Sequence, residues 1–295
     1  MPLYRIQHVT SYRHEAPAAS AWQTLRLRPR DEPGQTILDF DLELVPRVHD
    51  LASRRDAFGN HLHVFSVRES HLEFHVAASS LVRREASTRP ERARVSLAEA
   101  RAATDAAVLA GDFALEQFRH PTPHVPAVPE VKAITAKLSP SLDLVDALEV
   151  LGDIFARDFV FDATATDVGT PLAEVIRNRR GVCQDFAHLY LACARRLGLA
   201  AAYVSGYLRT EPPPGQPPLV GVDAMHAWVS VHVPGHGWFD YDPTNHCFAG
   251  DDHLVVARGR DYGDVSPIRG IFNGGGAHTL SLGVTVSAVD ACVLG

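Results

Sequence analysis

The sequence predicts an α+β fold, with an N-terminal antiparallel β domain followed by a core in which one helix packs on an antiparallel sheet. Apolar and polar residues alternate through much of the first part of the chain, as in half-buried strands. From about residue 96 apolar residues recur at helical spacing, and after residue 199 strand-like segments return. Runs of strands and helices in this order favour an α+β arrangement. We expect a β-rich domain at residues 1–95, a helical segment at 96–160 and a catalytic core with C-terminal strands at 161–295.

Composition and charge describe an ordinary globular chain and exclude several partners. The chain has 295 residues, 46% hydrophobic and 21% charged, and its formal net charge is −7. It has no long basic run that could neutralise phosphates, so we expect neither nucleic-acid binding nor attachment to an anionic membrane. We predict no cofactor, and the sequence carries no signal of oligomeric state.

The N-terminus and the cysteines indicate a reducing compartment. No run approaches the roughly 18 apolar residues of a spanning helix, and MPLYRIQHVTSYRHE lacks the apolar stretch of a signal peptide. We therefore predict a cytoplasmic location. Cys183, Cys193, Cys247 and Cys292 match no zinc spacing, and in the cytoplasm they are expected to be free thiols.

Alternation predicts the strands of the N-terminal domain. Apolar residues from Leu38 to Leu44 alternate with acidic ones, which gives one buried and one wet face. Further strands are expected at residues 3–13, 22–27, 61–67 and 71–76, with a turn at Gly59-Asn60. We expect a small antiparallel sandwich or sheet.

The helical segment begins near Ser96, three residues before Glu99 as in a capping box. Residues 121–129 are rich in proline and are expected to be a linker or an extended crossing. Apolar residues between Leu144 and Phe155 recur at helical spacing and predict a second helix. Thr170-Pro171 opens a short third one.

After Leu199 the chain is predicted to return to strands at residues 201–210, 224–233 and 237–243. The proline-rich residues 211–218 are expected to form a surface loop. The tail is glycine-rich and closes with a strand-like stretch at 280–289.

Cys183 is the candidate nucleophile. It stands in the first turn of a helix predicted to end at Gly198, on the same apolar stripe as Phe186 and Tyr190. Unpaired backbone N–H groups and the positive end of the helix dipole favour a thiolate there, and one N–H group can help to hold an oxyanion. A small core cysteine is the alternative, and it is our prediction for Cys193 in mid-helix.

Two later strands are predicted to supply a base and the carboxylate that orients it. His226 and Trp228 share one face of the first strand. If residues 233–237 form the hairpin loop, Trp228 pairs with Asp242, which then lies diagonal to His226 and within side-chain reach. A loop of residues 234–237 alone would place Asp242 on the opposite face.

Three neighbouring residues have subsidiary roles. Asp240 has the same parity as Asp242 and is its rival, but a hydrogen-bonded strand residue is the expected role. Asp185 is predicted to support the active-site loop by accepting backbone N–H bonds, although acids are favoured in any first helical turn. Trp228 is predicted to support His226.

Histidines of the β domain raise a metal alternative. His71, Glu73 and His75 share one strand face, and His61 and His63 share another. Three ligands on one face can hold zinc. Polar alternation on a half-buried sheet produces the same pattern without a metal, so we predict no metal site.

With these residues in place, the chain resembles the transglutaminase-like superfamily, cysteine enzymes related in fold to papain. The strings GVCQDFAH, AYVSGYL, MHAWVSV and GWFDYDPTN carry the resemblance, and LYRIQHVTSYRHE and DAFGNHLHVF resemble the N-terminal domain of bacterial members. The resemblance implies a transglutaminase/papain-like core in which Cys183, His226 and Asp242 form a triad. It also implies that the segment DDHLVVARGRDYGDVSP borders the cleft. Ala202 stands where an arginine is common in similar proteins.

The predicted function is a cysteine-dependent hydrolase that cleaves amide or peptide bonds of a peptide or protein through a thioester. A protein-glutamine transglutaminase is the first alternative, since it adds only an amine acceptor. An arylamine acetyltransferase would use the same triad but needs a nucleotide-binding patch that the sequence does not display. A non-catalytic binding module is the last alternative, and the presence of all three triad residues argues against it.

Overall fold

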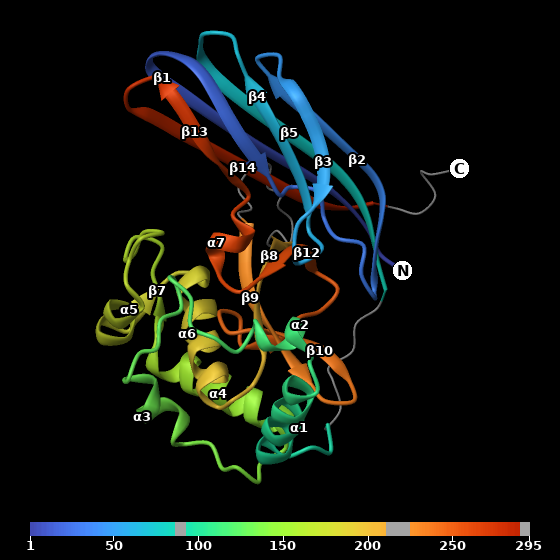
Figure 1. The fold of residues 1–295 in the computed structure, drawn as a ribbon, viewed down its shortest axis with the longest axis vertical. Helices are drawn as coiled ribbons and strands as arrows, with labels where there is room; N and C mark the ends of the chain where they lie inside the picture. The colour runs from blue at the N-terminus through green and yellow to red at the C-terminus, as the bar shows by residue number, and fades with distance from the viewer. Residues whose placement is uncertain (86–92, 211–224, 290–295) are drawn as a thin grey trace, which may run out of the picture.

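The computed structural model describes residues 1–85, 93–210 and 225–289, in which a β domain lies against a core of helices and strands (Figure 1). The predicted loop at residues 211–218 and Cys292 lie outside the described residues. Within the described ranges, no helix has both the length and the apolar character needed to cross a bilayer. The strands are β1 (Leu3–Leu25), β2 (Gln35–Val45), β3 (His49–Arg55), β4 (His61–Val67), β5 (His71–Arg84), β6 (Val160–Phe161), β7 (Arg180–Gly181), β8 (Ala201–Leu208), β9 (Met225–Val233), β10 (Gly237–Asp242), β11 (Cys247–Phe248), β12 (His253–Gly259), β13 (Ile268–Gly274) and β14 (His278–Val289). The helices are α1 (Leu97–Leu109), α2 (Phe113–Glu116), α3 (Val131–Thr135), α4 (Leu144–Asp158), α5 (Leu172–Asn178), α6 (Cys183–Arg196) and α7 (Tyr262–Val265).

The long strand β1 is central to the N-terminal antiparallel sheet. Its residues 3–14 lie between β5 and β14, and its residues 18–25 lie between β4 and β13. β2 pairs with β5, and β3 pairs with β4. The separate strands predicted at 3–13 and 22–27 are therefore parts of one strand, which is irregular where its register to β5 shifts.

The predicted fold class is confirmed, but one part of the predicted domain division differs from the structure. The sequence placed all of residues 161–295 with the core, whereas β13 and β14 pair with β1 in the N-terminal sheet (Figure 1). Alternation along a strand shows which residues lie on each of its two faces, but it does not show which strands lie beside it. The C-terminal stretch could therefore have belonged to either sheet. The two C-terminal strands cover the side of β1 that β4 and β5 leave free.

The helices begin and end at the predicted signals. Ser96 and Glu99 form the capping box of α1, in which the Ser96 N–H donates to Glu99 Oε2 at 2.8 Å and the Glu99 N–H donates to Ser96 Oγ at 3.3 Å. Beyond the end of α6, Gly198 has a φ of 85°, and a Cβ there would lie 2.8 Å from the Arg101 side chain. Residues 121–129 contain neither helix nor strand, as expected from their prolines.

The core sheet is antiparallel, with the strand order β11-β10-β9-β8-β12. Helix α6 packs against β9 and β8 (Figure 1). Tyr190 and Cys193 of α6 are fully buried there, and the Tyr190 hydroxyl donates to the Leu148 carbonyl of α4 at 2.7 Å. The predicted core, in which the helix that begins at Cys183 packs on an antiparallel sheet, is confirmed, and Cys193 is a packing residue of that core.

The N-terminal domain covers the free edge of β12, the last strand of the core sheet. The Gln35 side-chain amide donates to the Val255 carbonyl at 2.8 Å and accepts the Val255 N–H at 2.9 Å. Asn60 repeats this arrangement on Arg258, with both distances 2.8 Å. Two side-chain amides thus take the place of a neighbouring strand and fix the domains against each other.

Arg258 also joins the domains through a largely buried group of charges. Its guanidinium lies 2.8 Å from Glu32 of the N-terminal domain and 2.9 Å from Asp240 of β10, and the three side chains are only 18%, 12% and 15% exposed. Burial alone would lower the pKa of Arg258, but the two carboxylates raise it above its usual range. The residue therefore stays charged between two domains.

Candidate active site

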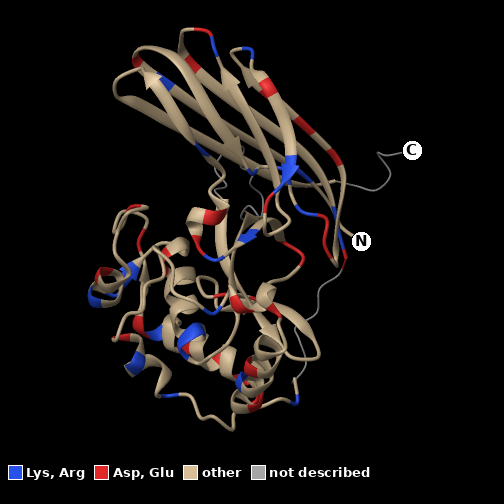
Figure 2. Ribbon diagram, in the orientation of Figure 1, with Lys and Arg blue, Asp and Glu red and all other residues tan. Residues whose placement is uncertain are grey.

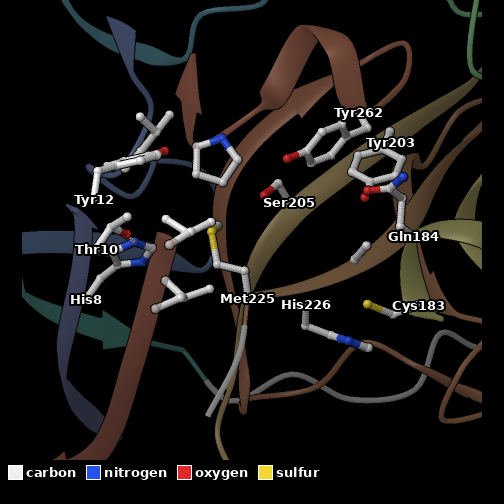
Figure 3. Close-up of a pocket in the computed structure, with 15 residues that line it drawn as sticks. His8, Thr10, Tyr12, Cys183, Gln184, Tyr203, Ser205, Met225, His226 and Tyr262 are labelled. Carbon is white, nitrogen blue, oxygen red and sulfur yellow. Dashed lines mark hydrogen bonds between the residues drawn. The ribbon is translucent and has the colours of Figure 1, made fainter. Parts of the chain in front are cut away.

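A cavity of about 220 Å³ lies where the N-terminal sheet meets the core (Figure 3). Cys183 and His226 line it from the core, and His8, Thr10 and Tyr12 line it from β1. The cavity therefore brings the predicted nucleophile and base together with the first strand of the chain.

The fold places Cys183 in the first turn of a helix, at the edge of the cavity. Helix α6 begins at Cys183 itself, after Val182 in an extended conformation. The first backbone N–H groups of a helix have no acceptor within it, and the positive end of the helix dipole lies beside the sulfur. Cys183 is only partly buried. The sulfur is therefore accessible and lies beside unpaired helix N–H groups.

Asp185 holds the turn that precedes the nucleophile. Its Oδ2 accepts the Val182 N–H at 2.8 Å, which is the kind of backbone bond predicted for it, and the Thr166 hydroxyl at 2.5 Å. Burial raises the pKa of the Asp185 carboxyl. A Cβ on Gly181 would lie 2.7 Å from the same oxygen, so glycine leaves the space that this bonded carboxylate needs.

The hairpin of β9 and β10 brings His226 and Asp242 together. The two strands pair in the register predicted for a loop at residues 233–237. His226 Nε2 lies 2.7 Å from Asp242 Oδ2, and the Cys183 thiol lies close enough to the ring to raise its pKa. Because the carboxylate occupies Nε2, Nδ1 is the ring nitrogen left for the thiol. Figure 3 shows the imidazole and the sulfur facing each other across the cavity floor.

Hydrogen bonding reverses the effect of burial on both members of this pair. Burial alone would lower the pKa of His226, but hydrogen bonds to Asp242 and Cys183 raise it to about 10. Burial alone would raise the pKa of Asp242, but hydrogen bonds from His226, His253 and Asn245 hold it far below its usual range. At neutral pH the two groups are therefore a charged imidazolium–carboxylate pair.

Sequence reasoning missed two further partners of Asp242. His253 Nδ1 accepts the Gly250 N–H at 3.1 Å, so its proton lies on Nε2, which is 3.1 Å from Asp242 Oδ2. Asn245 Nδ2 donates to the same oxygen at 2.7 Å. A signal existed only for Asn245, whose place three residues after Asp242 suits a turn that folds back on the carboxylate.

Asp240 does not orient His226. It accepts hydrogen bonds from the Trp228 indole at 3.0 Å, from the Ser230 hydroxyl at 2.5 Å and from Arg258 at 2.9 Å. It is thus the hydrogen-bonded strand residue expected from the sequence. Trp228 is fully buried, and its ring lies 6.0 Å from the His226 ring.

Ala202, which stands where similar proteins commonly have an arginine, lies close to an arginine from another strand. Ala202 pairs with Ser230, which pairs with Asp240 in the next strand. Ala202 and Arg258 line the same hollow on this side of the sheet. The guanidinium that meets Asp240 therefore comes from β12, over a small side chain at position 202.

The β-domain histidines do not converge on a metal site within the described part of the chain. Groups of three close potential ligands do not arise there from His71, Glu73 and His75, nor from His61 and His63. The one such group in the described ranges surrounds Asp242, where both imidazoles make direct hydrogen bonds to a single carboxylate oxygen.

The cavity also narrows the choice of oxyanion donors. Asn178 ends α5 and does not line the cavity, whereas Tyr203, Tyr262 and Gln184 do. The backbone N–H groups of the first turn of α6 lie beside the sulfur. An oxyanion at this site would therefore meet helix N–H groups, with tyrosine hydroxyls as further donors. Tyr262 belongs to the segment expected to border the cleft.

We expect iodoacetamide at pH 6 to alkylate Cys183 while Cys193 and Cys247 remain unmodified. Burial raises the pKa of Cys193 and Cys247, the other two thiols among the described residues, that of Cys247 to about 11. The raised pKa of His226 keeps its ring charged up to about pH 9, and a cation beside the sulfur stabilises the thiolate. Timed alkylation followed by peptide mapping measures the three rates. A His226→Gln variant should be alkylated more slowly at Cys183, and equal rates in the two proteins would contradict the role of the imidazolium.

Comparison with sequence families and relatives agrees with this architecture. Residues 4–83 match the bacterial transglutaminase-like N-terminal region, and residues 131–243 match the transglutaminase-like superfamily. An uncharacterized protein of Mycobacterium tuberculosis is 38% identical over 278 residues, covering 91% of this chain and 87% of the relative. An uncharacterized protein of Mycobacterium leprae is 30% identical over 286 residues, covering 96% and 98%.

A solved structure shares the whole fold. It is described as that of "a Putative Cysteine Protease from Cytophaga hutchinsonii", and it superposes with a TM-score of 0.79 at 18% identity, covering 98% of this chain and 91% of that one. At this identity the match shows the fold alone. From the two family matches and the mycobacterial relatives, the chain belongs to the transglutaminase-like superfamily and carries the bacterial transglutaminase-like N-terminal region.

Proposed function

We propose that the protein is a cysteine-dependent hydrolase that cleaves amide or peptide bonds through a thioester. One observation carries the proposal: the His226 imidazole is hydrogen-bonded to Asp242, and it lines one accessible cavity together with Cys183. Nucleophile, base and orienting carboxylate are the groups that acyl transfer requires. The relation to cysteine enzymes of similar fold supports the same chemistry.

In the proposed reaction the Cys183 thiolate attacks the substrate carbonyl carbon, and a C–S bond forms as the C–N bond breaks. The His226 imidazolium gives its Nδ1 proton to the departing amine. A water molecule then attacks the thioester and passes a proton to His226, while the C–S bond breaks and restores the thiolate. Asp242 holds the ring by Nε2 throughout and stabilises its charged form.

Asn245 and His253 complete this arrangement as positioning residues. Each gives a hydrogen bond to Asp242 Oδ2, the same oxygen that contacts His226. The carboxylate is therefore fixed from three directions and cannot rotate away from the ring. A cytoplasmic location belongs to the same proposal, because a thiolate nucleophile must stay reduced.

Amine transfer by a protein-glutamine transglutaminase is the principal alternative, and a binding module without catalysis is the other. We expect a mixed peptide pool incubated with the enzyme to yield new peptide termini or free ammonia. A labelled primary amine added to the pool should not be incorporated at glutamine. Mass spectrometry of the pool distinguishes the three outcomes.

The matched control for this experiment is Cys183→Ala, because background hydrolysis continues in it. If the wild-type protein incorporates the labelled amine and Cys183→Ala does not, the proposed reaction is wrong and the protein is a transglutaminase. If the wild-type protein and Cys183→Ala give the same products, the protein does not catalyse either reaction through Cys183, and the binding module is the remaining alternative.

A further inference from the structure

Two exposed leucines of β14 form an apolar wall of the catalytic cavity. Leu280 and Leu282 line it together with Cys183 and are 58% and 47% exposed. β14 contains no Lys, Arg, Asp or Glu (Figure 2). Large apolar side chains left open to solvent beside a nucleophile are a surface that a ligand can cover.

The pleat of the sheet fixes the direction of this wall. Val284 and Val286 belong to the buried core shared with the catalytic domain, and Leu280 and Leu282 continue the same face of β14 because alternate residues point to the same side. On the neighbouring strand Tyr4 and Ile6 are buried in that core, and the same face continues into the cavity.

Two cross-strand pairs build the wall. Thr10 of β1 stands opposite Leu282, and Tyr12 stands opposite Leu280. Figure 3 shows the β1 side chains across the cavity from Cys183, with Met225 between them. Since the hydrogen bonds of Gln35 and Asn60 fix the two domains against each other, the wall keeps its place relative to the nucleophile.

Two polar residues of the wall, His8 and Thr10, are hydrogen-bonded and uncharged. His8 Nε2 lies 2.9 Å from the Thr10 hydroxyl, and His8 Nδ1 lies 3.0 Å from the Tyr207 hydroxyl. Burial lowers the pKa of His8 to about 4, so its ring is neutral at pH 7. The described residues that line the cavity include no lysine, arginine, aspartate or glutamate. Away from the His226 imidazolium at the reacting end, a charged substrate group would therefore lose water without gaining a partner.

The size of the cavity limits what can occupy it. Its volume of about 220 Å³ lies below the roughly 300–1,000 Å³ typical of pockets for whole drug-sized ligands. It can therefore take one side chain or short acyl chain, while the remainder of a peptide lies outside.

We propose that this cavity is the specificity pocket of the enzyme and selects an uncharged, apolar side chain or acyl chain next to the attacked carbonyl. Leu280 and Leu282 of β14 are its specificity-determining residues. The inference rests on the proposed function, and it assigns the N-terminal domain, completed by the C-terminal strands, a direct part in substrate choice.

Three iodoacetamides with N-substituents of nearly equal shape test the pocket. N-isobutyl, N-carbamoylmethyl and N-carboxymethyl iodoacetamide carry an apolar, a neutral polar and an anionic group. In each reaction the Cys183 sulfur bonds to the methylene carbon and iodide leaves with the electrons of the C–I bond. We expect the isobutyl reagent to alkylate Cys183 about tenfold faster than the carbamoylmethyl reagent, and the carboxymethyl reagent to be slowest, after correction for their rates with a small free thiol.

Variants assign the selectivity to the wall. Leu282→Asn and Leu280→Asn keep the side-chain shape and should bring the isobutyl-to-carbamoylmethyl ratio close to that of the free thiol. The control is Leu51→Asn on β3, because Leu51 is 51% exposed on the same sheet but does not line the cavity, and it should keep the wild-type ratio.

The outcomes separate the pocket from the proposed function. Equal corrected rates in the wild-type protein would overturn the apolar pocket, with no variant needed. A wild-type ratio in folded Leu282→Asn and Leu280→Asn proteins would overturn the assignment to β14. Alkylation is measured without turnover, so a protein that shows the selectivity but cleaves no peptide would refute hydrolysis and leave the pocket standing.

Discussion

Replacement of Cys183 by alanine is expected to reduce turnover by about 10⁶-fold, the scale seen when the nucleophile of a triad is removed. The loss is large because no other described thiol can take over. Cys193 is fully buried in α6, and Cys247 does not line the catalytic cavity. The substitution removes only a partly exposed sulfur from the first turn of a helix, so the fold should persist. Hydrolysis of the peptide pool and the thermal unfolding midpoint measure the two effects.

Cys193→Ala provides the matched control on the same helix. It leaves a small gap in the core and should lower the free energy of unfolding by about 1 kcal/mol, while turnover remains near the wild-type value. The opposite pattern, with activity retained by Cys183→Ala and lost in a folded Cys193→Ala protein, would refute the assignment of the nucleophile.

Replacement of Arg258 by methionine is expected to lower the free energy of unfolding by about 3 kcal/mol, toward the lower end for a broken buried ion pair. The variant leaves Glu32 and Asp240 facing each other without the cation between them, at 12% and 15% exposure. Burial alone would raise the pKa of Asp240, and Arg258 now holds it below its usual range. Denaturant unfolding at pH 7 measures the loss.

Arg260→Met is the control for this substitution. Arg260 pairs with Asp264, four residues later in the chain, and is 44% exposed, so its loss should change the free energy of unfolding by less than about 0.5 kcal/mol. Because the Asp240 pKa is held down by Arg258, the ion pair stabilises the fold above the ordinary carboxyl pKa and is lost as the pH falls through the lowered one. If Arg258→Met and Arg260→Met lower the free energy of unfolding by similar amounts at pH 7, the buried group of charges stabilises the fold no more than an exposed ion pair does.

The sequence could predict the parts of the site that depend on local spacing. The first-turn place of Cys183 follows from helical periodicity, and the contact of His226 with Asp242 follows from one hairpin register. His253 could not be found in this way, because its contact with Asp242 depends on the path of a later strand around the sheet.

The pairing of strands far apart in the sequence was the part of the fold that the sequence could not predict. The alternation in residues 280–289 correctly predicted a strand, but it contained nothing to choose between the core sheet and the N-terminal sheet. The sequence therefore did not indicate that Leu280 and Leu282 line the same cavity as Cys183. Only the pairing of β14 with β1 brings these C-terminal residues to that cavity.

The contacts that the Gln35 and Asn60 side-chain amides make with β12 have a consequence for how this protein can be divided. A catalytic fragment cut free of the first domain would expose the Val255 and Arg258 backbone groups as a bare strand margin. Such a margin is a template for another chain, so the fragment would tend to self-associate into aggregates. The N-terminal domain thus protects the core sheet from pairing with other chains.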